Sequence, residues 1–398
     1  MAKNNIVIGS SSAPDSGSGI NSYCKEVSEE LMRSGCIVHY LSPAPSDRSW
    51  LESNNIKHLS VGQGDSPKAA VDTILGYIKE NNISAIINND NAHIQNAAPF
   101  VRIPFISVVH LGETNILSLA KWNSQWVDYL VAISNQMKQT LTLRHAIQSS
   151  KVPIIYNGIR DPFRLLDLEA EPEYRVVFNG GSNKRKGADL LLKSVTKFPK
   201  GWEGFCLDWY GSLNDEYDEA LAKLPFVKRC GRVSREDMIT ALEKADIFLL
   251  PSRKEGCPMA MIEAMAAGNI CIASTGEGAM DVMVTHGENG FVCNLSKWSE
   301  EVVDILGLLG PNKNRILQMK KKARQQYLDR FQVGHTVKRL QELIKTPTVD
   351  RASLPDKAML VRWHRPLIEG TNRAPFLDRI KIKFGMLTKD RRFTPIEE

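Results

Sequence analysis

Two acidic side chains, Glu255 and Glu263, flank a short apolar segment that contains Pro258. A pattern typical of a buried strand, Ile247-Phe-Leu-Leu-Pro251, comes just before them. Proline suits the first position of a helix, because the N–H that it lacks is not needed there. We therefore expect Glu255 in the loop before a helix and Glu263 in the second turn of that helix.

The amides between the two acids are suited to binding an anion. The free N–H groups of a first helical turn and the positive end of the helix dipole both favour negative charge. A diphosphate is an anion whose two flanking groups could each use a carboxylate. One acid could accept hydrogen bonds from the sugar hydroxyls and the other from the ribose hydroxyls. A rise of about 1.5 Å per helical residue separates the acids by a distance on the scale of a diphosphate. The segment therefore predicts a nucleotide-sugar site that includes Gly256, Cys257, Pro258, Met259 and Ala260.

Taken together, the two acids resemble the E-x7-E signature of retaining GT-B glycosyltransferases, in particular those of glycosyltransferase family 4. Either acid alone would more simply be a solvated or helix-capping residue. The resemblance covers most of residues 1–345 and is strongest over 174–294. It implies that Glu255 positions the donor sugar, that Glu263 binds the ribose, and that the sugar is transferred with retention. Because this family generally has no protein nucleophile, we assign no general base.

The segment 178–187 leaves a strand pattern, enters a helix pattern, and carries Gly180, Arg185 and Lys186. Basic residues in such a loop are suited to a diphosphate, although a solvated basic turn has the same composition. Lys186 matches the family pattern G-R-L-x-x-x-K-G, whereas the usual Arg of that pattern is Gly181 here. We therefore expect Arg185 to supply the missing charge.

Three further positions complete the predicted site by resemblance. His110 ends the strand pattern of residues 105–110 and resembles the family histidine that touches the donor sugar. Gly19 lies in a Gly/Ser loop after the first strand, where an open α/β sheet places its ligand loop. Arg232 and Val233 lie where the family has the loop that flanks the nucleotide base.

Strand-like apolar segments alternate with helix-period segments, which predicts an α/β fold with doubly wound parallel sheets. The alternation stops in a polar, proline-bearing stretch at 158–173 and then restarts. We predict a GT-B architecture of two Rossmann-like domains that face a central cleft. The expected division is an acceptor-side domain at 1–160, a donor domain with cross-over helices at 161–345, and a basic extension at 346–398.

The composition excludes several other classes. At 398 residues with 42% hydrophobic content, the chain is an ordinary globular protein without an apolar run of roughly 20 residues, so a cytoplasmic location is expected. Its seven cysteines are scattered, which predicts neither a disulfide framework nor a zinc site. No Asp-x-Asp occurs, which favours metal-independent chemistry over the GT-A glycosyltransferases. We expect no cofactor and no nucleic-acid partner.

The C-terminal segment is strongly basic. Residues 351–398 hold eleven Lys or Arg and six Asp or Glu, a surplus of five in a chain whose net charge is +6. Bulky apolar residues alternate with cations at 362–365 and 376–384, as they do in interfacial segments. The segment is thus a candidate for contact with the inner face of a membrane, and a solvated tail is the alternative.

The predicted reaction moves a hexose or N-acetylhexosamine from a nucleoside diphosphate sugar to a hydroxyl of an acceptor saccharide or glycolipid, in bacterial-type surface polysaccharide or glycolipid assembly. Two alternatives remain open from the sequence: a nucleotide-sugar 2-epimerase of the same architecture, and a non-catalytic nucleotide-sugar binding module. A dinucleotide oxidoreductase is disfavoured, because Ser22 stands where the G-x-G-x-x-G fingerprint needs glycine.

Overall fold

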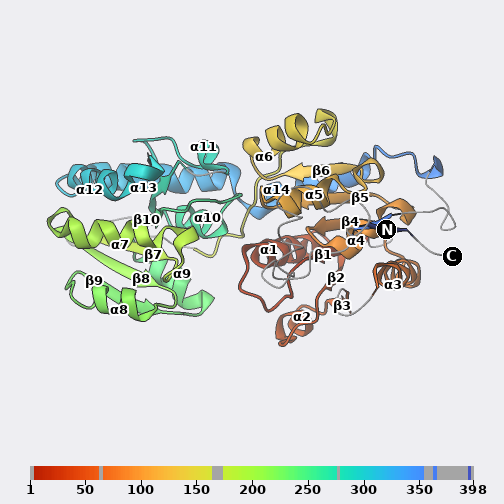
Figure 1. Ribbon diagram of the computed structural model, residues 1–398, viewed down its shortest axis with the longest axis horizontal. Coiled ribbons are helices and arrows are strands. Elements are labelled where there is room, and N and C mark those ends of the chain that lie inside the picture. Colours follow the sequence, from red (N-terminus) through yellow and green to blue (C-terminus); the bar gives the residue numbers. More distant parts are fainter. Residues whose placement is uncertain are drawn as a thin grey trace. The chain divides into compact units, whose positions relative to one another are not determined.

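The computed structural model describes residues 4–61, 66–163, 174–275, 278–353, 362–364 and 393–395. The chain forms two compact units (Figure 1). The first comprises residues 1–155 and 336–398, and the second comprises residues 156–335. Each unit contains a six-stranded sheet in which every pairing is parallel, as the alternation of strand and helix patterns predicts.

The sheet of the first unit has the order β3-β2-β1-β4-β5-β6. Its strands are β1 (Asn5–Ser10), β2 (Ile37–Ser42), β3 (Lys57–Ser60), β4 (Ala85–Asn89), β5 (Phe105–Val109) and β6 (Tyr129–Ala132). In the middle of the sheet, Ile8 of β1 pairs with Tyr40 on one side and with Ile87 on the other. These central strands are apolar on both faces because helices cover both faces of a parallel sheet.

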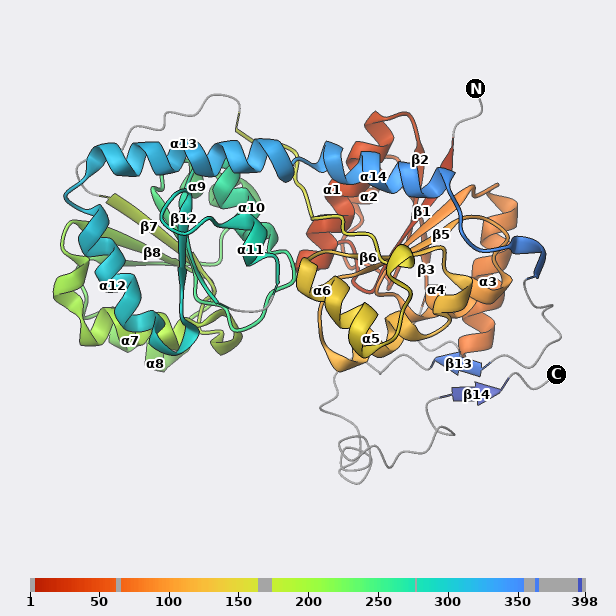
Figure 2. The same cartoon turned by 90° about the horizontal axis from the view of Figure 1, so that it is seen from above.

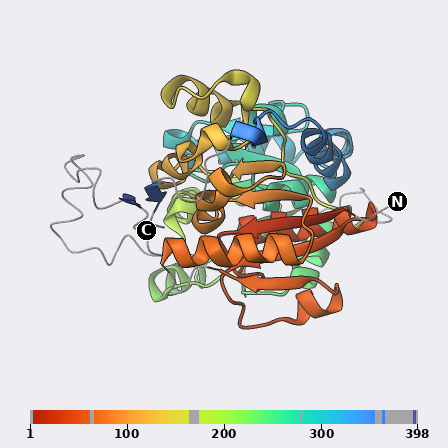
Figure 3. The same ribbon diagram turned by 90° about the vertical axis from the view of Figure 1, so that its right-hand side faces the viewer.

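The helices of the first unit connect its strands. One of them, α3, is the orange helix in Figure 3. They are α1 (Gly19–Arg33), α2 (Ser49–Ser53), α3 (Pro67–Glu80), α4 (Ala92–Ala97), α5 (Thr114–Lys121) and α6 (Asn135–Gln139). The core between helices and sheet includes Val7, Ile86, Phe105 and Leu130, each at most 1% exposed. Helix α14 (Val333–Lys345) begins in the second unit and ends in the first.

The sheet of the second unit has the order β12-β11-β10-β7-β8-β9. Its strands are β7 (Tyr174–Asn179), β8 (Phe205–Tyr210), β9 (Val227–Gly231), β10 (Ile247–Leu250), β11 (Ile270–Ser274) and β12 (Gly290–Cys293). Its helices are α7 (Ala188–Lys197), α8 (Asp215–Leu221), α9 (Arg235–Glu243), α10 (Met259–Ala266), α11 (Met280–Met283), α12 (Trp298–Leu309) and α13 (Lys313–Arg330). The long α13 packs on α10 and β11 (Figure 2), over a core that contains Trp202, Trp209 and Trp298.

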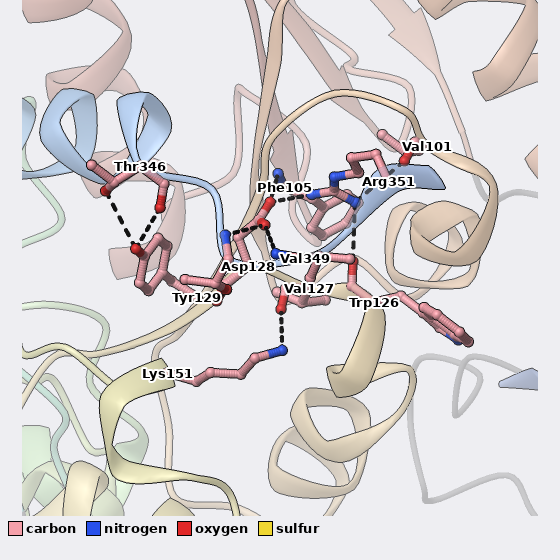
Figure 4. A network of polar contacts seen from close by, with 11 residues as sticks. Val101, Phe105, Trp126, Val127, Asp128, Tyr129, Lys151, Thr346, Val349 and Arg351 are labelled. Carbon is pink, nitrogen blue, oxygen red and sulfur yellow. Dashed lines mark hydrogen bonds and ion pairs between the residues drawn. The ribbon is translucent and has the colours of Figure 1, made fainter. Parts of the chain in front are cut away.

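The segment after α14 is fastened to the first unit through the carboxylate of Asp128, which is fully buried just before β6 (Figure 4). Its Oδ1 accepts hydrogen bonds from the amides of Thr348 at 2.9 Å and Val349 at 2.8 Å. Its Oδ2 accepts from the amide of Phe105 at 2.8 Å and pairs with Arg351. We call these five residues the Asp128 clamp. The clamp joins the C-terminal segment to the start of β5 and to β6.

Part of the basic C-terminal segment is also described. Strands β13 (Arg362–His364) and β14 (Phe393–Pro395) form a two-stranded antiparallel sheet. The apolar and basic stretch at 376–384 lies outside the described residues. None of the helices within the described ranges combines the length and the apolar character that crossing a bilayer requires.

Several elements differ from those that the sequence predicts. Residues 152–156, whose apolar pattern also predicts a strand, form only an isolated bridge between Ala132 and Ile154, because Pro153 has no N–H to continue the ladder. The strands β3 and β12 were not predicted, since four residues are too few to show a clear alternation. Pro258 is the N-cap of α10, one position before the predicted one.

Candidate functional site

The loops that follow β7, β8, β10 and β11 approach one another closely in the second unit. Gly187 has φ +78°, and a Cβ at this position would lie 2.0 Å from the carbonyl oxygen of Pro251. Gly181 has φ +52°, and its Cβ would lie 2.4 Å from the carbonyl oxygen of Ser212. The carboxyl ends of parallel strands share one edge of a sheet, so these glycines allow adjacent loops to meet there. Gly180 lies in the same loop, where its carbonyl accepts from the amide of Asn183 at 3.0 Å.

Lys186 and Glu255 form an ion pair at this edge, with 2.7 Å between Nζ and Oε1. The Lys186 side chain is 27% exposed and the Glu255 side chain 10% exposed. Glu255 lies in the loop before α10, as predicted, and Lys186 ends the short 3-10 turn after β7. A lysine ammonium has three N–H groups, so the contact with Glu255 leaves Lys186 able to donate to a further partner. The structure therefore joins a cation and a carboxylate that the sequence separates by 69 residues.

Arg253 holds the basic loop in place, a role that the sequence analysis did not identify. Its guanidinium makes a bidentate contact with Asp189 of α7, at 2.8 and 2.7 Å, and also donates to the carbonyl of Lys184. Its amide donates to the carbonyl of Arg185 at 2.9 Å. Burial alone would raise the pKa of Asp189, but the hydrogen bonds and charge of Arg253 lower it overall. The Arg185 side chain is exposed at the surface of this braced loop.

The entrance to α10 is fixed from two sides. Asn157 is 3% exposed and donates from Nδ2 to the carbonyl of Cys257 at 2.8 Å. On the other side, the amide of Ala279 donates to the carbonyl of Gly256 at 2.8 Å. Gly278, with φ +128°, lets this second segment pass close to the Glu255 and Gly256 carbonyls. These contacts hold the loop that carries Glu255 against the first turn of α10.

The first turn of α10 contains Met259, which is buried, and Ala260, which is half-buried. Because the first N–H groups of a helix have no intrahelical acceptor, these amides are available to an anion. Burial raises the pKa of the Cys257 thiol to about 12, so this thiol stays protonated and is not a nucleophile. The arrangement favours anion binding by backbone groups rather than covalent chemistry.

The other predicted residues of this unit lie around the same edge. Glu263 is in the second turn of α10, as predicted, with its side chain 18% exposed and 3.8 Å from a guanidinium nitrogen of Arg235. Arg232 follows β9 and donates from Nε to the Ser212 hydroxyl at 2.7 Å. The neighbouring Val233 is 38% exposed. Glu263 is thus a partly exposed carboxylate beside the helix entrance.

Two predicted site residues belong to the first unit. His110 follows β5, is 4% exposed, and has its Nε2 3.1 Å from Oδ1 of Asn89. Burial lowers the pKa of His110 to about 3, so its imidazole is neutral at physiological pH. Gly19 is the first residue of α1, and Ser18 caps that helix by accepting from the amide of Asn21 at 3.1 Å. Among the described residues, apart from its own helix and chain neighbours, no heavy atom lies within 4 Å of a Cβ built on Gly19.

Twelve of the predicted donor-binding and catalytic positions lie in the second unit. Ten of them gather at one sheet edge, and Ala260 and Glu263 continue along α10. The ten are Gly180, Arg185, Lys186, Arg232, Val233, Glu255, Gly256, Cys257, Pro258 and Met259. Sequence reasoning missed Arg253, Asp189 and Gly278, whose signals are long-range. Within the described part of the chain, no group of three or more His, Cys, Asp or Glu side chains could hold a metal ion. Chemically, this edge is suited to an anion flanked by hydroxyl groups.

Two family models match the chain, one in each half. Residues 17–161 match the model described as Glycosyltransferase Family 4, and residues 173–309 match the model described as Glycosyl transferases group 1. An uncharacterized glycosyltransferase of Haemophilus influenzae is 35% identical over 147 residues, which are 35% of this chain and 40% of that protein. The amylovoran biosynthesis glycosyltransferase AmsK of Erwinia amylovora is 25% identical over 179 residues, 42% of this chain and 41% of AmsK.

The chain spans about half the length of the first curated relatives that it matches, between 40% and 60%. Solved structures match over a larger share. A glycosyltransferase from Rickettsia africae has a TM-score of 0.72 at 17% identity, over 87% of this chain and 98% of that one. Anabaena Alr3699/HepE in complex with UDP has a TM-score of 0.70 at 17% identity, over 86% of this chain and 100% of that one. This likeness confirms the predicted two-domain α/β GT-B fold.

Proposed function

Because the chain belongs to the group 1 and family 4 glycosyltransferases, we propose that it transfers a hexose or N-acetylhexosamine from a nucleoside diphosphate sugar to an acceptor hydroxyl. The observation that carries this proposal is the Lys186–Glu255 pair at the entrance to α10, with 2.7 Å between the charged atoms. A cation, a helix N-terminus and a carboxylate at one point are what a diphosphate joined to a sugar requires.

In this proposal the diphosphate lies against Lys186 and the amides of Met259 and Ala260, with Arg185 close by. Fixed positive groups stabilise the charge that develops on the leaving diphosphate, and such electrostatic terms are often the largest in catalysis. Arg253 contributes by holding the loop that carries Arg185 and Lys186. With these groups supplying the positive charge, we propose that transfer does not require a divalent metal.

The two carboxylates would bind the two ends of the donor. Glu255 is 10% exposed, and besides its contact with Lys186 it has acceptor sites for sugar hydroxyls. Glu263 lies further along α10, and we assign it to the ribose hydroxyls. Arg232 and Val233 follow the edge strand β9 and are assigned to the surroundings of the base. Among solved relatives, Alr3699/HepE was crystallised with UDP and with UDP-glucose, so UDP-sugars are the first donors to test.

We propose transfer with retention at the anomeric carbon and without a protein base. The bond from the anomeric carbon to the diphosphate oxygen breaks, and the acceptor oxygen bonds to that carbon on the same face. The proton of the acceptor hydroxyl passes to the departing phosphate oxygen. His110 is neutral and is assigned to a sugar hydroxyl rather than to phosphate. The name of the Erwinia relative supports an acceptor in polysaccharide assembly, and a saccharide or glycolipid acceptor on the cytoplasmic side is proposed here.

The experiment is a thermal-shift screen of UDP- and GDP-sugars, followed by assays of donor turnover with and without acceptor saccharides. A donor at one hundred times its Kd stabilises the folded state by about 2.7 kcal/mol. Lys186→Ala should weaken this binding, whereas Lys184→Ala, a change of the same kind on an exposed side chain two residues away, should not. If no nucleotide sugar raises the melting temperature, the proposal is wrong. Acceptor-independent formation of an epimerised sugar would instead indicate a 2-epimerase.

A further inference from the structure

Asn89, the last residue of β4, has an amide whose orientation is set by its surroundings. Its Nδ2 donates to the carbonyl of Gly9 on the neighbouring strand β1, at 2.9 Å. The other end of the amide, Oδ1, therefore faces Nε2 of His110 at 3.1 Å. Asn89 is fully buried and His110 is 4% exposed. The contact is thus a fixed feature of the first unit, where β4 lies between β1 and β5.

The contact decides which nitrogen of His110 carries the proton. An amide oxygen can only accept, so Nε2 of His110 must be the donor. A neutral imidazole has a single N–H, and its second nitrogen then keeps a lone pair. Nδ1 of His110 is therefore a hydrogen-bond acceptor. The edge-on ring of Tyr23, with 4.8 Å between ring centroids, packs against the imidazole.

Asp90 is a titratable group in direct contact with His110, and Glu113 lies near Asp90. Asp90 accepts from the amide of His110 at 3.3 Å, and it adopts φ +55°, which is uncommon for a residue other than glycine. Burial raises the pKa of Asp90 to about 8, and the nearby Glu113 contributes in the same direction. At neutral pH most of the Asp90 carboxyl is therefore protonated. A neutral imidazole beside carboxyl groups does not attract phosphate, but its acceptor nitrogen suits a hydroxyl donor.

We propose that Asn89 is a positioning residue, which holds His110 in the neutral Nε2–H form so that Nδ1 accepts a hydrogen bond from a sugar hydroxyl. This inference rests on the proposed function, since it assigns the group that His110 recognises. It explains why an uncharged amide lies beside the histidine. An aspartate there would stabilise the imidazolium, whose Nδ1–H can only donate.

The test compares Asn89→Asp with Asn91→Asp. Asn91 is a matched control, because its Nδ2 also donates to a β1 carbonyl, that of Ser10 at 2.8 Å, while its Oδ1 caps α4. Both variants lose one donor to β1 and gain one carboxylate, but only the first change is in contact with His110. Nitrogen NMR of labelled histidine in the unliganded protein reports the tautomer, with the His110 signals identified by their loss in His110→Gln.

The wild type should show a neutral His110 with the proton on Nε2. Asn89→Asp should raise the pKa of His110 by about one unit or more, because an opposite charge in contact favours the charged form. Asn91→Asp should change it much less. A proton on Nδ1 in the wild type, or equal pKa values in the two variants, would overturn the role of Asn89.

Ligand binding separates this inference from the proposed function. UDP-glucose should shift the Nδ1 resonance of His110, whereas UDP alone should leave it nearly unchanged. In assays, Asn89→Asp should lose kcat/KM relative to the wild type as the pH falls toward the raised pKa of His110, by about three- to tenfold, the value of one hydrogen bond, with UDP affinity kept. If neither ligand binds, the proposed function fails. If both bind and shift Nδ1 equally, the proposed function survives and this inference fails.

Discussion

Replacing Arg351 with alanine should destabilise the first unit, because it removes the cation of the Asp128 clamp (Figure 4). The Arg351 side chain is 17% exposed, and it pairs with a carboxylate that is fully buried. It also donates to the carbonyls of Val101 and Trp126, each at 3.3 Å. The substitution would leave the Asp128 charge without its counter-ion in the interior.

The expected loss in the free energy of unfolding depends on the hydrogen bonds that Asp128 keeps. Removing one partner of a buried ion pair typically costs about 3 to 5 kcal/mol. The carboxylate of Asp128 would still accept from the amides of Phe105, Thr348 and Val349, so we expect the lower end, about 3 kcal/mol. In a unit of this size each kcal/mol shifts the melting temperature by roughly 2 to 4 °C, which gives a decrease of about 6 to 12 °C.

The assay is thermal and urea unfolding of the full chain, combined with hydrogen exchange of the β5 and β6 amides, because the two units need not unfold together. Arg339→Ala is the matched control. Arg339 pairs with Glu342 on α14, with the two side chains 56% and 42% exposed, so its removal should cost less than about 1 kcal/mol. If Arg351→Ala costs no more than Arg339→Ala, or if exchange in β5 and β6 is unchanged, the amides alone satisfy Asp128 and the reasoning is refuted.

Three further predictions concern the proposed activity. Glu255→Gln should lower turnover with saturating donor while keeping UDP affinity, whereas Glu263→Gln should weaken UDP binding, each by about tenfold to a hundredfold as expected for a charge-assisted hydrogen bond; unchanged turnover in Glu255→Gln would contradict the assignment. Activity should survive EDTA, and an Arg185→Ala/Lys186→Ala double variant should bind donor diphosphate more weakly, so a strict requirement for magnesium or manganese would exclude this arrangement. The full chain should sediment with anionic vesicles at low salt more than a chain ending at Ser353, which keeps the Asp128 clamp. Each Lys or Arg near the anionic surface should contribute about 1 kcal/mol to binding, so equal and negligible binding by both chains would rule out the tail as a membrane element.

The local features of both units could be predicted from the sequence. Alternating strand and helix patterns predicted the parallel α/β architecture, which the solved structures confirm. The positions of Glu255 before α10 and Glu263 in its second turn also follow from short-range rules, because a proline and the helical repeat act over a few residues. Elements of four residues, such as β3 and β12, carry too few residues for such rules.

The contacts that build the candidate site could not be predicted, because they join residues far apart in the chain. Asn157 and the Cys257 carbonyl are 100 residues apart, and Arg253 and Asp189 are 64 apart. Which loops meet depends on the order of strands in the sheet, and that order comes from packing rather than from local preference. The sequence indicated separate roles for Lys186 and Glu255, and only the fold shows that they are paired.

Sequence alone determined which residue types are available: a histidine after a strand, two acids around a helix entrance, and a basic loop. Tertiary structure decided their states. His110 is neutral because burial removes the water that would stabilise its charge, and Asn89 selects its tautomer because β4 and β5 are neighbours in the sheet. Charge state and hydrogen-bond role depend on solvent exposure and on the partners that the fold provides, and neither quantity is a property of a residue's position in the chain.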